Sequence, residues 1–167
     1  MTRTAETLQQ AWEPIKAAYA GGLIGNEATL QAWLFSALRQ EFPGAQVFCE
    51  MTVLMPDGSR CHPDLLLVED GRVLIALELK LARSGYPPFE KDIGKLARLC
   101  ALDSLARIEA ELPLKCVGAA RARFSPQTLC AFACVAKGDA AIRDEASVRA
   151  KCDGVLPENF LPLIIDL

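Results

Sequence analysis

Two neighbouring runs of the sequence, at 65–68 and 73–77, are apolar at every position, and they constrain the fold more than any other feature. The first reads Leu-Leu-Leu-Val and the second reads Val-Leu-Ile-Ala-Leu. A strand with one face in water alternates apolar and polar residues, whereas a strand that is apolar on both faces lies inside a covered sheet. The sequence therefore predicts a central sheet with helices on each side.

The remaining elements follow from periodicity and from turn residues. Strands are expected at 46–55, 60–68, 72–81 and 128–136, with turns at 56–59 and 69–71. Helices are expected at 5–19, 27–40, 89–105 and 140–151, and a short apolar segment at 161–167 ends the chain. The order is two helices, three strands, a helix, a strand and a helix.

Charged residues interrupt the apolar pattern where the strand at 72–81 ends. Glu78 and Lys80 are two positions apart, so their side chains point to the same face of that strand. Asp64, which follows Pro63, lies near the start of the preceding apolar run. Two carboxylates can hold a divalent cation, and a neighbouring ammonium group can steer or polarise a water molecule. These three side chains are candidates for metal-assisted hydrolysis of a phosphodiester.

The turn between the two strands decides whether Asp64 shares the face of Glu78. A two-residue turn at 70–71 would direct Asp64 to the opposite face. A three-residue loop at 69–71 would pair Asp64 with Ala76 and would make Glu78 its diagonal neighbour, about 7–8 Å away. A shared metal site therefore requires the three-residue loop or a β-bulge.

Glu27 allows two interpretations. Asn26 is a good N-cap, and Leu30, Leu34 and Leu38 form a buried stripe on which Glu27 occupies the N-terminal end. An acidic residue in the first turn interacts favourably with the helix macrodipole, which explains Glu27 without any function. Alternatively, Glu27 points towards the metal site.

The pair Pro63-Asp64 followed by Glu78-Leu79-Lys80 resembles the signature of the PD-(D/E)xK nuclease superfamily. The resemblance covers about residues 26–137 and includes a glutamate, Glu27, on the helix before the three strands. It implies a restriction-endonuclease-like αβββαβ sandwich with a central mixed sheet, here with an additional N-terminal helix. We expect residues 1–167 to form a single domain of this α/β class.

The resemblance also implies an activity and a division of roles. It implies hydrolysis of nucleic acid, above all DNA, with Mg²⁺ or Mn²⁺ as the cofactor. Asp64, Glu78 and the backbone carbonyl of Leu79 would bind the metal. Lys80 would orient or help deprotonate the attacking water, and Glu27 would complete the acidic cluster.

Basic residues are concentrated after the start of the third strand. Residues 72–137 contain 11 Lys or Arg and 6 Asp or Glu, whereas the rest of the chain contains 7 and 15, and the net charge of the whole chain is −3. A basic region beside the site could bind a phosphate backbone. The candidate contacts are Lys91 and Lys95, on the helix that often supplies such groups in the superfamily, and Arg121 and Arg123. A solvated helix face or a solubility feature would explain them equally well.

Other classes of protein find less support. His62 is the only histidine, so a Ser-His-Asp enzyme would depend on it entirely and a zinc site is not expected. The seven cysteines contain no Cys-x-x-Cys pair and fit reduced thiols in a core. The longest uncharged run, 124–136, is too short to cross a bilayer, and the N-terminus lacks a signal-peptide pattern, so we expect a cytoplasmic protein without membrane contact.

One alternative function keeps the same fold. A non-catalytic nucleic-acid-binding or assembly module could retain the nuclease architecture without turnover. The hydrophobic content of 51% is high enough to suggest a buried subunit interface, and a homodimer is one expectation for its assembly. The presence of every key residue of the signature favours the enzyme.

Overall fold

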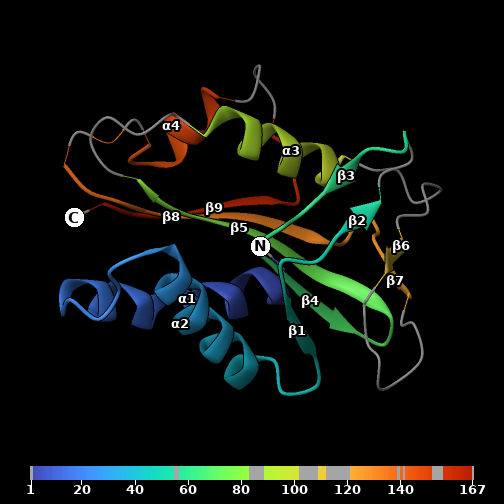
Figure 1. The fold of residues 1–167 in the computed structure, drawn as a ribbon, viewed down its shortest axis with the longest axis horizontal. Coiled ribbons are helices and arrows are strands. Elements are labelled where there is room, and N and C mark those ends of the chain that lie inside the picture. The colour runs from blue at the N-terminus through green and yellow to red at the C-terminus, as the bar shows by residue number, and fades with distance from the viewer. Residues whose placement is uncertain are drawn as a thin grey trace.

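The computed structural model describes residues 2–54, 57–82, 89–101, 109–111, 121–138, 140, 142–151 and 156–166. These residues form a mixed α/β fold in which a mixed sheet lies between two layers of helices (Figure 1). The expectation of a central, covered sheet is confirmed. In the described part of the chain, no helix has both the length and the apolar character needed to cross a membrane.

Four helices make up the two layers. They are α1 (Arg3–Ala20), α2 (Glu27–Glu41), α3 (Glu90–Cys100) and α4 (Glu145–Arg149). Figure 1 shows α1 and α2 on one side of the sheet and α3 and α4 on the other. Each layer covers its own apolar cluster, so the sheet separates two hydrophobic cores.

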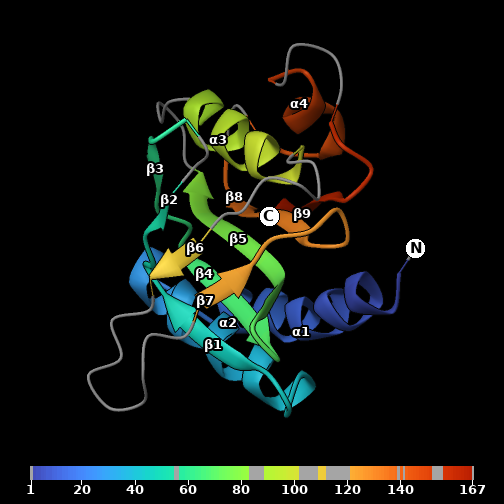
Figure 2. The ribbon, with the colours of Figure 1, turned by 90° about the vertical axis from the view of Figure 1, so that its right-hand side faces the viewer.

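The long strands occupy the centre of the sheet. The strands are β1 (Gln46–Cys49), β2 (Val53–Leu54), β3 (Arg60–Cys61), β4 (Leu65–Glu69), β5 (Arg72–Ala82), β6 (Glu109–Glu111), β7 (Arg121–Arg123), β8 (Leu129–Ala136) and β9 (Phe160–Asp166). β4 lies antiparallel to β1 and to β5, while β8 lies parallel to β5 and to β9. β7 pairs with the first residue of β5, and β6, β2 and β3 continue the sheet from there. Figure 2 views the sheet from the side, between α3 and the α1–α2 pair.

Several expected elements are divided or shortened. The strand expected at 46–55 is divided between β1 and β2 because Glu50 has a left-handed φ of 52°. The strand expected at 60–68 is divided between β3 and β4, with Pro63, which has no backbone N–H for the ladder, in the gap. The first two helices, β5 and β8 lie within two residues of their expected bounds.

The C-terminal third differs more from the expectation. The helix expected at 140–151 is only the short α4, because the Asp144 side chain accepts a hydrogen bond from the Ser147 N–H and caps the helix there. Segment 161–167, for which no strand was predicted, contributes β9. The helix expected at 89–105 ends at Cys100, and residues 102–105 lie outside the described part of the chain.

The β4–β5 hairpin decides between the three-residue loop and the β-bulge, the two alternatives that a shared metal site allows. Glu69 pairs with Arg72, so the turn has two residues, Asp70 and Gly71, with φ of 50° and 69°. Of the two alternatives, the three-residue loop at 69–71 is therefore not the one formed. A β-bulge lies next to the turn: Val68 pairs with Val73, but Leu67 pairs with Ile75, which leaves Leu74 as an extra residue on β5.

Packing on the two sides of the sheet shows the effect of the bulge. Val73 contacts the cluster under α3 and α4, whereas Leu74 and Ile75 both pack on the α1–α2 side. From Ala76 onward the alternation resumes, with Ala76 on the α3–α4 side and Leu77 on the α1–α2 side. The bulge thus shifts the parity of β5 by one residue.

The described cysteines lie in the core, as predicted, except Cys49, which is exposed. Cys49, Cys61, Cys100, Cys130 and Cys134 are free thiols. The other two, Cys116 and Cys152, lie outside the described residues.

Candidate active site

The bulge brings Asp64 opposite Glu78. Leu65 pairs with Leu77, so one further step of the same antiparallel register places Asp64 across from Glu78. The backbone N–H of Leu79 donates to Asp64 Oδ2 over 2.6 Å. The predicted juxtaposition of the two carboxylates is therefore achieved by the bulge and not by the loop.

The backbone of Asp64 is held from two further elements. Its carbonyl oxygen accepts a hydrogen bond from the Glu50 N–H over 2.9 Å and from Gln31 Nε2 over 3.0 Å. Glu50 lies just after β1, and Gln31 lies on α2. Neither contact was predicted, because each joins segments far apart in the chain. Together with the Leu79 N–H they fix Asp64 at the entrance to β4.

Glu78 belongs to a closed ring of four alternating charges, which we call the charge ring: Glu78, Lys80, Asp92 and Lys95. Glu78 Oε1 lies 3.2 Å from Lys80 Nζ, and Glu78 Oε2 lies 3.9 Å from Lys95 Nζ. Asp92 Oδ2 lies 3.6 Å from Lys80 Nζ, and its Oδ1 lies 3.6 Å from Lys95 Nζ. β5 therefore supplies one acid and one base of the ring, and α3 supplies the other two.

Glu27 approaches the ring from the opposite helix layer. Its carboxylate lies 3.9 Å from Lys80 Nζ, and its side chain is 48% exposed. The predicted capping is confirmed, since Asn26 and Thr29 form a capping box that starts α2 directly before Glu27. Both interpretations of Glu27 are thus compatible with its position, because the residue occupies the first turn of α2 and also faces the charge ring.

The candidate phosphate contacts lie at different distances from the site. Lys95 belongs to the charge ring, and Lys91 is exposed one turn earlier on α3. Arg121 and Arg123 are in β7, where Arg123 pairs with Arg72 at the beginning of β5. At about 3.3 Å per residue, that point is roughly 20 Å along β5 from Glu78. A nucleic acid would have to extend along the sheet to contact both the lysines of α3 and the arginines of β7.

Burial raises the pKa of three carboxyl groups of the site, those of Glu78, Asp64 and Glu27. Burial, followed by the charge of Asp64, raises the pKa of Glu78 to about 7. Burial also raises the pKa of Asp64 and that of Glu27. At Glu27 the positive charge of Lys80 is the main opposing effect. Burial opposes the charge of Lys80, but the surrounding carboxylates, led by Glu78 and Asp64, outweigh it and raise the pKa of its ammonium group. Lys80 is therefore a cation at neutral pH.

The site contains one buried oxygen without a hydrogen bond. Glu78 Oε2 is inaccessible to solvent and accepts no hydrogen bond, and its contact with Lys95 is a long one. A buried acceptor in this condition carries a desolvation cost that the long contact with Lys95 offsets only in part. A hard divalent cation would satisfy it, since such cations are bound through carboxylate oxygens.

The charge balance of the site would favour such a cation, with two carboxylates as its side-chain ligands. The carboxylates of Glu27, Asp64, Glu78 and Asp92 outnumber the two lysines of the charge ring by two, so fully ionised side chains leave two negative charges in excess. Mg²⁺ is usually held by one or two carboxylates and several waters. Among the described residues, however, no group of three or more His, Cys, Asp and Glu side chains is arranged so that it could hold a metal ion.

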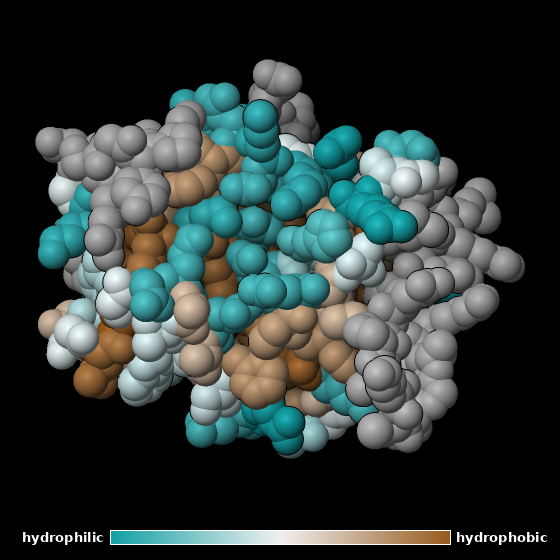
Figure 3. Space-filling model, in the orientation of Figure 1, coloured by the Kyte–Doolittle hydropathy of each residue, from teal (hydrophilic) through white to brown (hydrophobic). Residues whose placement is uncertain are grey.

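A small cavity adjoins Asp64 on the α2 side. Its volume is about 160 Å³, and it is lined by Glu27, Ala28, Gln31, Glu50, Asp64 and Leu79. Figure 3 shows hydrophilic side chains gathered across the middle of this face of the molecule, between α3 and α2. The site is therefore polar and open to water on one side, so that a charged ligand could reach it.

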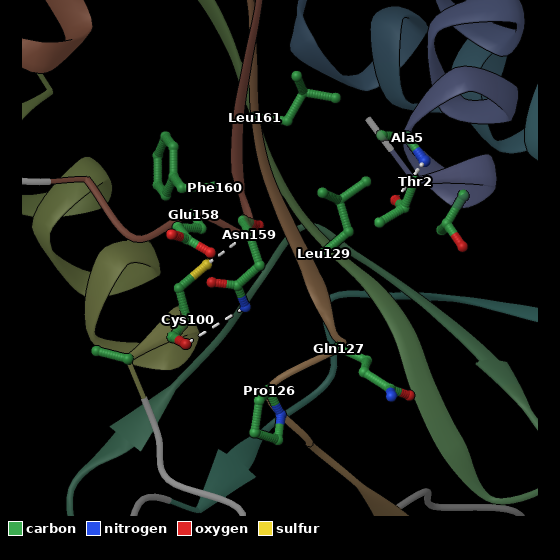
Figure 4. Close-up of a pocket in the computed structure, with 12 residues that line it drawn as sticks. Thr2, Ala5, Cys100, Pro126, Gln127, Leu129, Glu158, Asn159, Phe160 and Leu161 are labelled. Carbon is green, nitrogen blue, oxygen red and sulfur yellow. Dashed lines mark hydrogen bonds between the residues drawn. The ribbon is translucent and has the colours of Figure 1, made fainter.

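A larger cavity lies apart from these residues. It has a volume of about 1000 Å³ and lies between the first turn of α1, the end of α3 and the beginnings of β8 and β9 (Figure 4). Leu129, which lines it, pairs with Ile75 of β5, three residues before Glu78. None of the residues that line it belongs to the charge ring or binds Asp64.

No family model matches this chain. No curated protein sequence and no solved structure matches it either. The function must therefore be inferred from the arrangement of the side chains in the site.

Proposed function

We propose that this protein is a metal-dependent nuclease that hydrolyses phosphodiester bonds in nucleic acid, with DNA as the expected substrate. The observation that carries the proposal is the buried, unsatisfied Glu78 Oε2 on a strand directly opposite Asp64. Two adjacent carboxylates whose charges repel each other are stabilised by a divalent cation that they share. Mg²⁺ or Mn²⁺ is the cation that we propose.

The order and direction of the surrounding elements support a restriction-endonuclease-like fold. α2 precedes the antiparallel strands β1, β4 and β5, and α3 then leads across to β8, which lies parallel to β5. This order supports the αβββαβ arrangement expected from the sequence, with α1 as the additional helix and with β2–β3 and β6–β7 as extra strands between its members. Asp64 and Glu78 would then correspond to the metal ligands of the PD-(D/E)xK superfamily.

The residues of the site would then divide the chemistry among them. Asp64, Glu78 and the Leu79 carbonyl would hold the cation, which supplies Lewis-acid stabilisation of charge on the phosphoryl oxygens. Lys80 carries a positive charge beside these ligands and would orient the attacking water. Glu27, across from Lys80, would help to retain that water at the mouth of the site.

A plasmid-nicking assay tests the proposal. Purified protein should convert supercoiled plasmid to the relaxed form with Mg²⁺ or Mn²⁺, and EDTA should stop the reaction. A parallel assay on single-stranded and double-stranded DNA and on RNA identifies the substrate. Binding of nucleic acid without cleavage under any of these conditions would instead support a non-catalytic binding module.

We also expect Lys91 to contact the phosphate backbone. The Lys91→Ala variant should bind DNA more weakly, and the slope of log K against log salt should become shallower by about 1 for the lost contact. Fluorescence anisotropy with labelled DNA and Ca²⁺ in place of the catalytic cation measures both quantities. Arg39→Ala removes an exposed charge at the far end of α2 and is the matched control. An equal change of slope in both variants would show that only net charge matters.

The same measurement applied to Arg123 reports how far the nucleic acid extends. A duplex that reaches from Glu78 to β7 would span about six base pairs, at roughly 3.4 Å per pair. If it does, the Arg123→Ala variant should show the same shallower slope on a duplex of about 12 base pairs, which is longer than that span. An unchanged slope would remove Arg123 from the set of phosphate contacts.

A further inference from the structure

Asp92 is the acidic member of the charge ring for which the proposed reaction has no role. It lies in the first turn of α3, and its side chain is 29% exposed. Its two oxygens contact different lysines, Oδ2 facing Lys80 and Oδ1 facing Lys95, each at 3.6 Å. Asp92 therefore faces the lysine of the proposed reaction from the helix layer opposite to that of Glu27.

Among the described residues, Lys80 has three carboxylate partners, and they are not equivalent. Glu78 is the nearest at 3.2 Å, Asp92 follows at 3.6 Å, and Glu27 lies at 3.9 Å. The ammonium group also lies 5.8 Å from the centre of the Phe89 ring, and the Lys80 side chain is only 13% exposed. A partly buried ammonium group that loses its nearest carboxylate without another to replace it is strongly destabilised.

Lys80 and a divalent cation compete for the carboxylate of Glu78. The cation would bind Glu78, so the contact between Lys80 and Glu78 weakens when the cation binds. Of the other two partners, Asp92 is the closer and the less exposed. It is also outside the set of proposed metal ligands, so its carboxylate stays available to Lys80 throughout.

We propose that Asp92 is a positioning residue that receives Lys80 when Glu78 binds the cation. This inference rests on the proposed function, because it assigns a role to Asp92 in the metal-bound state of the same site. By keeping Lys80 paired, Asp92 lowers the cost of releasing Glu78 and holds the ammonium group beside the metal ligands. Asp92 acts through Lys80 and does not itself bind the cation.

A double-mutant cycle on Mn²⁺ binding tests this role without relying on cleavage. Isothermal titration calorimetry measures the Kd for Mn²⁺ of the wild type, Asp92→Asn, Lys80→Gln and the double variant. Asp92→Asn should raise the Kd about tenfold when Lys80 is present, since Lys80 is then left with Glu78 as its main partner. In the Lys80→Gln background the same change should raise the Kd by about twofold or less, through the loss of one negative charge and of its contact with Lys95, which lies farther from Glu78 than Lys80 does.

Two controls separate positioning from a general structural role. Asp92→Glu keeps the carboxylate and should restore the Mn²⁺ affinity to within about threefold of wild type. Glu90→Gln removes a 58% exposed acid from the same helix turn, one that is paired with Lys151 at 3.2 Å, and should leave the affinity unchanged. Circular dichroism melting curves establish that each variant is folded.

The outcomes are distinguishable from one another. An equal rise in Kd on both backgrounds would overturn the inference, because it would make Asp92 a ligand or a simple charge, while leaving the metal site of the proposed nuclease in place. A wild type that binds no Mn²⁺ would overturn the proposed function itself, and the role of Asp92 with it.

Discussion

Replacing Glu78 with glutamine should reduce metal-dependent cleavage by about 10³-fold, because a metal ion supplies several kcal/mol of stabilisation to the transition state and each 1.4 kcal/mol is about tenfold in rate. Glutamine keeps the size of the side chain but removes the charge that binds the cation. The buried position of Glu78 leaves little room for water to replace the lost ligand. The plasmid-nicking assay at several Mg²⁺ concentrations measures the effect.

The melting temperature distinguishes this loss from unfolding. Without metal at pH 8, Glu78→Gln should be at least as stable as the wild type, since it removes a carboxylate that burial and Asp64 destabilise. Added Mg²⁺ should stabilise the wild type and leave the variant unchanged. Glu41→Gln, at the exposed end of α2, is the control and should behave as the wild type in both assays. Full cleavage by Glu78→Gln would remove Glu78 from the metal ligands.

The stability of the metal-free protein should rise as the pH falls from 8 to 5, by more in the wild type than in Glu78→Gln. In the folded protein the pKa of Glu78 is raised from its ordinary value of 4.5 to about 7, so the folded state binds this proton more tightly than the unfolded state does. The stabilisation is complete below about pH 4.5 and is lost as the pH rises through about 7. The two pKa values correspond to a difference on the order of 3 kcal/mol.

Urea unfolding at pH 5, 6, 7 and 8 in the presence of EDTA measures this difference. Subtracting the unfolding free energy of Glu78→Gln from that of the wild type cancels the titration of all other groups. The pH dependence that remains therefore belongs to Glu78 and to its coupling with Asp64. Saturating Mg²⁺ should reverse the trend for the wild type, because the cation binds the ionised carboxylate. Unfolding free energies of wild type and variant that run parallel from pH 5 to pH 8 would show that Glu78 titrates normally.

The sequence is informative about the elements that carry the site. Continuous apolar runs predict the covered strands β4 and β5, and Asn26 predicts the start of α2, because both signals are local. The parity of Glu78 and Lys80 also follows from local spacing, and the structure places both near one another on β5. These are the features for which a few neighbouring residues determine the outcome.

The bulge at Leu74 could not be located in the same way. Leu74 lies within five consecutive apolar residues, so an extra residue there does not change the apolar pattern from which a bulge could be recognised. The need for a three-residue loop or a bulge was clear from the sequence, but the choice between them was not. The left-handed conformations of Asp70 and Gly71 show how the two-residue turn was accommodated.

Contacts between segments far apart in the chain could not be predicted from the sequence either. Gln31 and Glu50 meet at the carbonyl of Asp64, and Asp92 meets Lys80, only after the sheet and both helix layers have assembled. No local pattern distinguishes these three polar residues from others on the same elements. β9 was missed for a related reason, since the short apolar segment becomes a strand through its pairing with β8.

The bulge also determines where this chain can tolerate a change in length. One residue inserted into or deleted from β5 between Leu74 and Glu78 would carry Glu78 and Lys80 through the sheet to the α1–α2 side, and would bring Leu79 and Leu81 into the polar site. The tight turn at Asp70 and Gly71 lies on the other side of the bulge, so a longer hairpin end leaves the register beyond Leu74 unchanged. Divergent forms of this protein should therefore vary in length at the hairpin tip while keeping a constant spacing from Ile75 to Lys80.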